Sequence, residues 1–316
     1  MNAVPNSKPT NKPNPKVSEA MTTKLPTKKK AENPVSDHPL AHAIPPMYFL
    51  DEYISRDIAE VNDLDLLETA HNLKHNVLLS GPTGSAKTTL VYAYAAKMNM
   101  PVVNVACNGG IDVRQLIGGW QPTKDGSFQF VPGDLVIGIQ HGAVILLNEV
   151  NFMPPKIAAI IYGLLDRRRT IYLPDAAGSD FPTSVKAHAR TFIVADNNPG
   201  YQGTRPLNKA FKNRFAFKLE WGYEHAVEEQ LVGSPTLLSV IEELRKQAEV
   251  GDIETPISTN MMMEFEEFAY DENLGLDFAI MNFVSAFEPD ERNAVHEVLN
   301  LHKARIQEEL FSEEEK

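Results

Sequence analysis

The sequence predicts an α/β protein with a parallel, doubly wound sheet, followed by a smaller, all-helical domain. Up to about residue 220, short apolar runs alternate with helical stretches of about 10 to 15 residues, a pattern typical of βα units. The run Ala143 to Leu147 is apolar throughout, as a strand covered on both faces requires. After Trp221 the sequence reads as helices only.

The elements follow in order along the chain. We expect a helix over 64–73 and one over 88–99, where apolar side chains recur at helical spacing. Strands are predicted at 76–80, 102–106, 143–147, 191–195 and 215–219, and C-terminal helices at 236–250, 259–270, 276–287 and 290–309. The expected domains are an arm (1–40), an α/β domain (41–222) and a helical domain with an acidic tail (223–316).

The predicted arm has seven prolines among Lys, Asn, Ser and Thr residues, a composition typical of disorder. The net charge of −12 is uneven, because many lysines lie in the arm. An acidic body argues against broad contact with a nucleic-acid backbone. The run Lys28 to Lys30 could touch nucleic acid or a membrane, or could be a solvated segment.

Other features bound the class of protein. No apolar run approaches the ~18 residues of a membrane-spanning helix, and the N-terminus lacks the apolar core of a secretory signal. We therefore expect a cytoplasmic protein without a membrane span. Cys107 is the only cysteine, which excludes an intrachain disulfide and favours a small core residue.

A glycine-rich turn follows the first predicted strand and opens a helix, which is the sequence form of a phosphate-binding loop. Its backbone N–H groups would converge on phosphates, Lys87 would reach the β- and γ-phosphates, and the Thr88 hydroxyl would bind Mg²⁺. Ala86 stands where a second glycine is usual. The candidate ATP-binding residues are Gly81, Pro82, Thr83, Gly84, Ser85, Ala86, Lys87, Thr88 and Thr89.

The third strand ends in Asn148 and Glu149, about 60 residues after the loop. In P-loop ATPases an acidic pair here ends the strand next to the loop; its first member helps hold Mg²⁺ and its second polarises the attacking water. Glu149 is thus the candidate general base, with capping of the helix near Pro154 as the alternative. Asn148 is the candidate metal-site residue, although an amide brings no negative charge.

Two further polar residues complete the candidate catalytic set. Asn198 follows the fourth strand, where it could orient the water and sense the γ-phosphate, although Asn-Pro and Pro-Gly also favour a plain turn. Arg214 directly precedes the last strand. It could reach a neighbouring subunit's nucleotide and stabilise transition-state charge, or form a surface ion pair.

With these motifs in order, the chain resembles AAA+ ATPases of the MoxR branch, and most of all CbbQ/NorQ-type members. The matching segments include Gly81 to Thr88, Leu146 to Glu149, Asn198 to Gln202 and Arg214-Phe215. Residues 116–120 and 130–135 resemble the family's insert after the second strand, and residues 169–188 its hairpin insert before the sensor strand. The likeness covers roughly residues 47–290.

The resemblance implies a P-loop AAA+ fold with a helical lid, and a ring, with six subunits expected, that holds ATP and Mg²⁺ between subunits. Arg214 would then act across the interface and Asn198 as the sensor. Ala86 fits the family's loop, whereas Asn148 and Asn260 stand where an aspartate and an arginine are usual.

Three functions remain open. The first is an ATP-hydrolysing motor that remodels or activates a protein partner, as family members do with partners that carry a von Willebrand factor A domain. The second is a nucleotide-dependent scaffold with weak or no hydrolysis, suggested by Asn148 and Asn260. The third is a nucleic-acid-directed AAA+ subunit, suggested only by the lysines of the arm.

Overall fold

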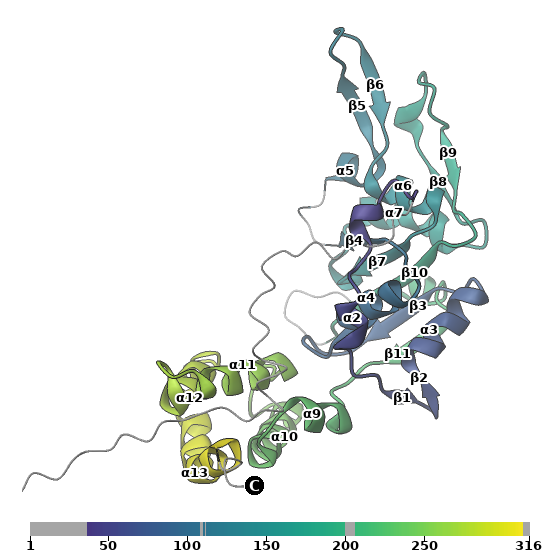
Figure 1. Cartoon of the computed structure of the whole chain (residues 1–316). Coiled ribbons are helices and arrows are strands. Elements are labelled where there is room, and N and C mark those ends of the chain that lie inside the picture. Colours follow the sequence, from purple (N-terminus) through teal and green to yellow (C-terminus); the bar gives the residue numbers. More distant parts are fainter. Residues whose placement is uncertain (1–36, 108–109, 111, 200–205, 312–316) are drawn as a thin grey trace, which may run out of the picture. The chain divides into compact units, whose positions relative to one another are not determined.

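The computed structural model describes residues 37–107, 110, 112–199 and 206–311. They divide into two compact units that meet in the sequence between Gly222 and Tyr223 (Figure 1). Most of the predicted arm, residues 200–202 of the quoted motif and the end of the acidic tail lie outside the described residues.

Five parallel strands form the central sheet of the first unit, in the order β11-β3-β10-β7-β4. The strands are β3 (Val77–Ser80), β4 (Val102–Ala106), β7 (Val144–Asn148), β10 (Phe192–Asn197) and β11 (Phe217–Glu220). Every predicted strand is present, which confirms the predicted α/β fold class. Their carboxyl ends lie at one edge of the sheet, called the carboxyl edge below.

One expectation about the sheet is wrong. The strand that ends in Asn148 is not next to the strand that precedes the loop, because β10 lies between β7 and β3 and pairs with both. The chain goes from β3 to the far edge at β4, returns through β7, and reaches the place beside β3 only with β10. Asp196 and Asn197 of β10 therefore stand in register with Leu79 and Ser80 of β3.

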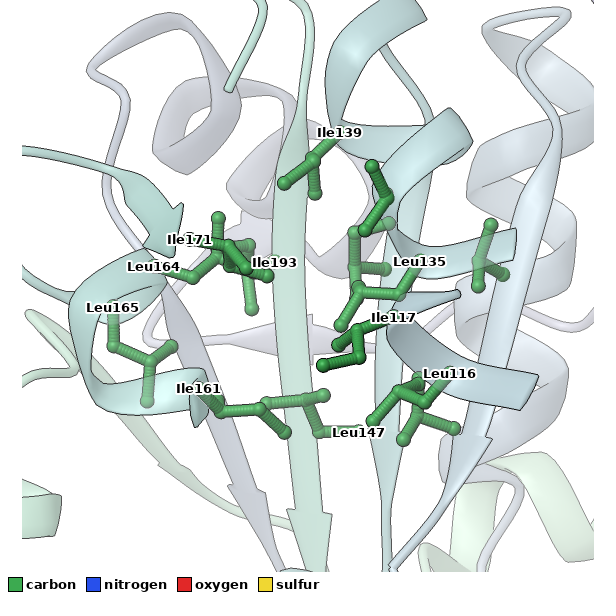
Figure 2. Close-up of a cluster of buried hydrophobic side chains, with 14 of the residues drawn as sticks. Leu116, Ile117, Leu135, Ile139, Leu147, Ile161, Leu164, Leu165, Ile171 and Ile193 are labelled. Atoms are coloured by element: carbon green, nitrogen blue, oxygen red, sulfur yellow. The ribbon is translucent and has the colours of Figure 1, made fainter. Parts of the chain in front are cut away.

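Helices cover both faces of the sheet, which explains why the central strand β7 is apolar from Val144 to Leu147. Val144 and Leu146 of β7 pack in a core with α3 (Asp63–Asn72) and α4 (Lys87–Lys97). Ile145 and Leu147 pack in a second core with α6 (Asp134–His141) and α7 (Pro155–Leu165), part of which is drawn in Figure 2. Cys107 is fully buried in this second core, as predicted.

Two antiparallel hairpins project side by side from the first unit (Figure 1). They are β5 (Gly119–Pro122) with β6 (Phe128–Val131), and β8 (Thr170–Tyr172) with β9 (Ser184–Lys186). The indole N–H of Trp120 donates to the carbonyl of Asp175 at 2.7 Å and joins them. The second hairpin lies within the segment 169–188, and the first begins and ends in the segments 116–120 and 130–135, which were expected as inserts.

Short elements complete the first unit. They are η1 (Ala41–Ala43), α2 (Tyr48–Asp51), β1 (Asp57–Ile58), β2 (Val61–Asn62), α5 (Val113–Ile117), η2 (Val150–Phe152), η3 (Pro174–Ala176) and α8 (Lys209–Lys212).

The second unit is helical, around one apolar core. Its helices are α9 (His225–Leu231), α10 (Pro235–Val250), α11 (Thr259–Tyr270), α12 (Gly275–Ser285) and α13 (Arg292–Phe311). Helix α10 begins with a Ser234 cap and Pro235 at its first position, both favourable at a helix start. Among the described helices of both units, none is long and apolar enough to cross a membrane.

Candidate nucleotide-binding site

The glycine-rich loop lies between β3 and α4, at the carboxyl edge of the sheet. Two of its residues have left-handed backbone, Gly84 at φ 66° and Ala86 at φ 65°. Ala86 is the cap residue of α4. An alanine in this conformation costs about 1 kcal/mol, which glycine would avoid.

Lys87 is folded into the loop and is 5% exposed. Its ammonium donates to the carbonyls of Gly81 (3.0 Å) and Pro82 (2.6 Å), and lies 3.4 Å from the Ser85 hydroxyl. Burial lowers the pKa of Lys87, while the negative charges of Asp196 and Glu149 act to raise it. The loop therefore encloses a cation whose nearest anions lie on β10 and just after β7.

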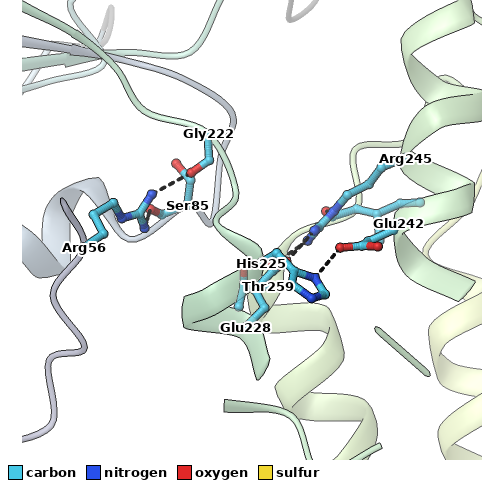
Figure 3. Close-up of polar contacts among 9 residues, drawn as sticks. Arg56, Ser85, Gly222, His225, Glu228, Glu242, Arg245 and Thr259 are labelled. Carbon is cyan, nitrogen blue, oxygen red and sulfur yellow. Dashed lines mark hydrogen bonds and ion pairs between the residues drawn. The ribbon is translucent and has the colours of Figure 1, made fainter. Parts of the chain in front are cut away.

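Two residues outside the loop fix its backbone. The indole N–H of Trp221 donates to the Ser85 carbonyl at 2.7 Å, and a guanidinium N–H of Arg56 donates to the same oxygen at 3.3 Å. Arg56 also donates to the Gly222 carbonyl at 2.8 Å, drawn in Figure 3, and stacks over the indole at 4.3 Å. A Cβ on Gly81 would lie 1.7 Å from the Trp221 carbonyl oxygen, so only glycine fits there.

We call these contacts of Trp221 and Arg56 with the loop the brace. Sequence reasoning missed the brace, because Arg56 and Trp221 lie 165 positions apart and no sequence motif joins residues so distant. The only signal was that Trp221 follows the last strand of the sheet.

Glu149 and Asn198 lie together at the carboxyl edge. Glu149 directly follows β7 with a left-handed backbone, φ 56°. Its carboxylate accepts a hydrogen bond from the Asn198 amide at 3.5 Å. Its side chain does not cap η2, and α7 has Pro154 at its cap position, so the capping alternative has no support here. The Asn198 side chain is buried, and its Oδ1 has no hydrogen-bond partner among the described residues.

Asp196 is a site residue that sequence reasoning did not single out. It lies on β10 and is 2% exposed. Its Oδ1 accepts the backbone N–H of Glu149 at 2.5 Å. The Asn148 amide nitrogen lies 3.1 and 2.9 Å from its two oxygens, in the amide orientation that satisfies both groups. Burial raises the pKa of Asp196, and the Glu149 N–H and Lys87 oppose that shift.

A signal for Asp196 was present, since it is the acidic residue at the tip of the strand that carries Asn198. Its significance depends on the strand order, which puts β10 directly beside the loop strand.

Arg214 is not brought to this group within the chain. Its carbonyl accepts from the Asn76 amide at 2.9 Å, just before β3 begins, which places it at the amino edge of the sheet. Its guanidinium donates to Asp166 at 2.8 Å and to the Ala210 carbonyl at 2.8 Å, and lies 4.4 Å from the Tyr162 ring centroid. The guanidinium is thus held by its own chain.

In the second unit, Asn260 lies exposed in the first turn of α11. The nearby half-buried arginine, Arg245, donates to both oxygens of Glu228, at 2.7 and 2.8 Å, as Figure 3 shows. It also donates to the Ile257 carbonyl at 2.9 Å and lies 3.7 Å from the Tyr223 ring centroid. The guanidinium of Arg245 is therefore bonded within the helical unit.

The oxygen-rich groups at the carboxyl edge fit a magnesium ion. Mg²⁺ prefers oxygen ligands and is usually held by one or two carboxylates together with substrate phosphates. The edge offers the Thr88 hydroxyl, the Asn148 amide, the Asp196 carboxylate and the unpartnered Oδ1 of Asn198. In the part of the chain that the structure describes, no three His, Cys, Asp or Glu side chains form a metal-binding group.

Comparison with known proteins agrees with this geometry. Residues 76–215 match the model of the AAA domain (dynein-related subfamily). An uncharacterized protein of Staphylococcus haemolyticus is 33% identical over 169 residues, which cover 52% of this chain and 61% of that protein. One of Staphylococcus saprophyticus is 35% identical over 168 residues, which cover 52% and 60%. The chain spans about three-fifths of these relatives' length.

A solved structure from Cytophaga hutchinsonii, described as a "putative ATPase", aligns over 86% of this chain and 83% of its own, with 17% identity and a TM-score of 0.40. The AAA-domain match, by contrast, covers the whole segment from the strand before the loop to Phe215. Together with the five parallel strands, the loop and the helical C-terminal region, that match shows that the chain has an α/β P-loop AAA+ fold.

Proposed function

We propose that this protein binds ATP with Mg²⁺ at the loop 81–89 and hydrolyses it. The observation that carries the proposal is that Lys87, Glu149, Asp196 and Asn198 meet at the carboxyl edge of one parallel sheet. Ligands of open α/β sheets bind at this edge. The AAA-domain match supports a nucleotide-dependent ATPase.

Each residue has a role that its surroundings support. The loop N–H groups and the start of α4 attract phosphate, and Lys87 adds a positive charge. Glu149 accepts the proton of the attacking water, and Asn198, in contact with its carboxylate, orients that water. Mg²⁺, when bound with the nucleotide, neutralises charge on the phosphates.

We further propose that the active form is a homo-oligomeric ring, with six subunits expected, of the MoxR type and most like its CbbQ/NorQ members. In such a ring Arg214 would leave Asp166 and reach the nucleotide of the neighbouring subunit. It could not reach the nucleotide of its own chain, because it lies at the amino edge of the sheet and the loop lies at the carboxyl edge. The client would be a protein, and a von Willebrand factor A domain is the partner that the resemblance suggests.

A nucleotide-dependent scaffold with weak hydrolysis is the second candidate. The observation that favours it is that the candidate arginine, Arg214, is already engaged with Asp166, while Asn260 stands where the resemblance leads us to expect a second arginine. If this pair persists in the assembled ring, little positive charge reaches the transition state.

Steady-state hydrolysis of ATP with Mg²⁺, measured at ring-forming concentrations, tests the proposal. Glu149→Gln should lower turnover by about 100-fold or more while ATP still binds, because the general base is lost. Lys87→Ala should abolish both binding and turnover. Glu220→Gln, which alters an exposed glutamate at the end of β11, and Lys124→Ala, which alters an exposed lysine, serve as matched controls and should leave turnover unchanged.

Wild-type turnover no higher than that of Glu149→Gln would exclude the motor. If ATP then still drives assembly, as light scattering can measure, the scaffold is the better description.

A further inference from the structure

Asn148 lies beside Asp196 at the end of β7, where the resemblance leads us to expect a negatively charged aspartate in place of Asn148. Asn148 ends β7 and brings no negative charge, whereas Asp196 lies on β10 between β7 and the loop strand β3. The Asn148 amide nitrogen lies 2.9 and 3.1 Å from the Asp196 oxygens. One carboxylate and one amide therefore share the edge, with the carboxylate on the strand nearer the loop.

Asp196 is a buried carboxyl group without a salt bridge to a cation among the described residues. It is 2% exposed, and burial of a carboxylate is costly without a nearby positive charge. No salt bridge of Asp196 is found among the described residues, and the ammonium of Lys87, which acts on it electrostatically, is bonded to loop oxygens. Its hydrogen bonds come instead from neutral donors, the Glu149 N–H and the Asn148 amide.

The same contacts fix the position of the general base. Because the Glu149 N–H donates to Asp196, the left-handed backbone of Glu149 is tied to β10. The Asn198 amide, two residues after Asp196, contacts the Glu149 carboxylate. The carboxyl group of Asp196 therefore helps to position Glu149, the candidate general base, next to Asn198, the candidate sensor.

We propose that Asp196 supplies the negative charge of the Mg²⁺·nucleotide site. Asn148 and Asp196 then form a pair in which the amide is at the end of β7 and the carboxylate is on the neighbouring strand β10, the reverse of an aspartate at the end of β7. The inference rests on the proposed nucleotide binding and deepens it. An aspartate at the end of β7 is not needed, because the carboxylate on the neighbouring strand takes its place. Asn148 is then a positioning residue that orients Asp196.

The test measures the affinity of the full-length protein for Mn²⁺, a paramagnetic substitute for Mg²⁺, in the presence of a non-hydrolysable ATP analogue. Free Mn²⁺ is counted by electron paramagnetic resonance. Asp196→Asn keeps the size of the side chain and an oxygen for the Glu149 N–H, but removes the charge. It should weaken Mn²⁺ binding by about 10- to 100-fold, as the loss of a residue that supports a metal site does.

The exchange variant, Asn148→Asp with Asp196→Asn, restores one carboxylate and one amide in the same pair. Its Mn²⁺ affinity should lie within about threefold of the wild-type value. Asp180→Asn, in an exposed loop, changes the net charge equally and should have no effect. If Asp196→Asn does not fold, as judged by circular dichroism, the exchange variant decides alone.

Unchanged Mn²⁺ affinity in Asp196→Asn, or a tenfold loss in the exchange variant, would overturn the inference. Both results leave nucleotide binding intact. If the wild-type protein bound no ATP analogue at all, the proposed function would fail instead, so the two failures are distinguishable.

Discussion

Trp221 and Ser85 are joined by a hydrogen bond from the indole N–H to the carbonyl oxygen, 2.7 Å long and buried. Trp221 comes directly after the sheet's last strand, and Ser85 lies in the middle of the glycine-rich loop. The backbone N–H of Trp221 also donates to Ser80, at the end of β3. The end of β11 therefore holds both the strand that enters the loop and the loop itself.

Because of this contact, we expect the fluorescence of Trp221 to report nucleotide binding at the loop. Trp120 and Trp221 are the only tryptophans, and Trp120 lies on the β5 hairpin. In a Trp120→Phe background, we expect ATP to change the Trp221 fluorescence, and Lys87→Ala to abolish that change. If the Trp221 fluorescence did not change at saturating ATP, the loop and Trp221 would not be coupled.

Trp221→Phe should weaken ATP binding without unfolding the unit. The ring keeps most of the packing, but the Ser85 carbonyl loses its closest donor. One lost hydrogen bond costs about 1 kcal/mol, so the ATP dissociation constant should rise about fivefold. Calorimetric titration measures it, with Trp120→Phe as the matched control. Equal affinities in the two variants would contradict the brace.

Ala86→Gly should stabilise the first unit. Ala86 has φ 65°, a left-handed conformation that costs alanine but not glycine. The greater entropy of glycine in the unfolded chain offsets part of this cost, so the net gain in the free energy of unfolding should be about 0.5 kcal/mol. Gly84→Ala, at φ 66°, is the reverse change and should destabilise. Denaturant unfolding followed by Trp fluorescence compares the two, and a shift of the same sign in both would refute this reading.

Mixed rings test the position of Arg214. Subunits with Arg214→Ala, combined with subunits that carry Glu149→Gln, should recover part of the wild-type ATPase rate, because some interfaces then join an intact arginine to an intact base. Neither variant alone should be active. No recovery on mixing, with mixed rings verified by mass, would indicate that Arg214 acts only through Asp166 in its own chain.

The helical unit should lose stability as the pH rises towards 7. Glu266 is fully buried and accepts the N–H groups of Gly233 and Ser234 at 2.9 to 3.0 Å. Its burial raises the pKa from 4.5 to about 7. The folded state therefore binds the proton more tightly than the unfolded state, and this stabilisation is complete below pH 4.5 and is lost as the pH rises through 7.

The loss between these pH values should reach about 3 kcal/mol in the free energy of unfolding. Glu266→Gln should flatten that dependence, because its amide does not ionise. Denaturant unfolding at pH 5, 6, 7 and 8, followed by helical circular dichroism, measures it. Glu264→Gln, an exposed neighbour on α11, should keep the wild-type slope. A Glu266→Gln slope as steep as the wild-type slope would assign the pH dependence to another group.

Local pattern was sufficient for the elements and the loop. Apolar runs specify buried strands wherever both faces of a sheet are covered, and the loop is recognisable because its glycines, lysine and threonine are contiguous. The helix from Thr259 to Tyr270 was predicted at its observed bounds. Glu149 and Asn198 were also found locally, since each follows the end of a strand.

The sequence by itself determined the fold class, the glycine-rich loop between a strand and a helix, and the candidate residues at the ends of the strands, because each depends on residues close together in the chain. Only the tertiary structure decided which strands are neighbours, because pairing depends on how the whole sheet assembles. That order placed Asp196 against Asn148 and brought Trp221 to Ser85, which Arg56 also contacts, while Arg214 lies at the amino edge of the sheet. These relations join residues distant in sequence, and no local pattern contains them.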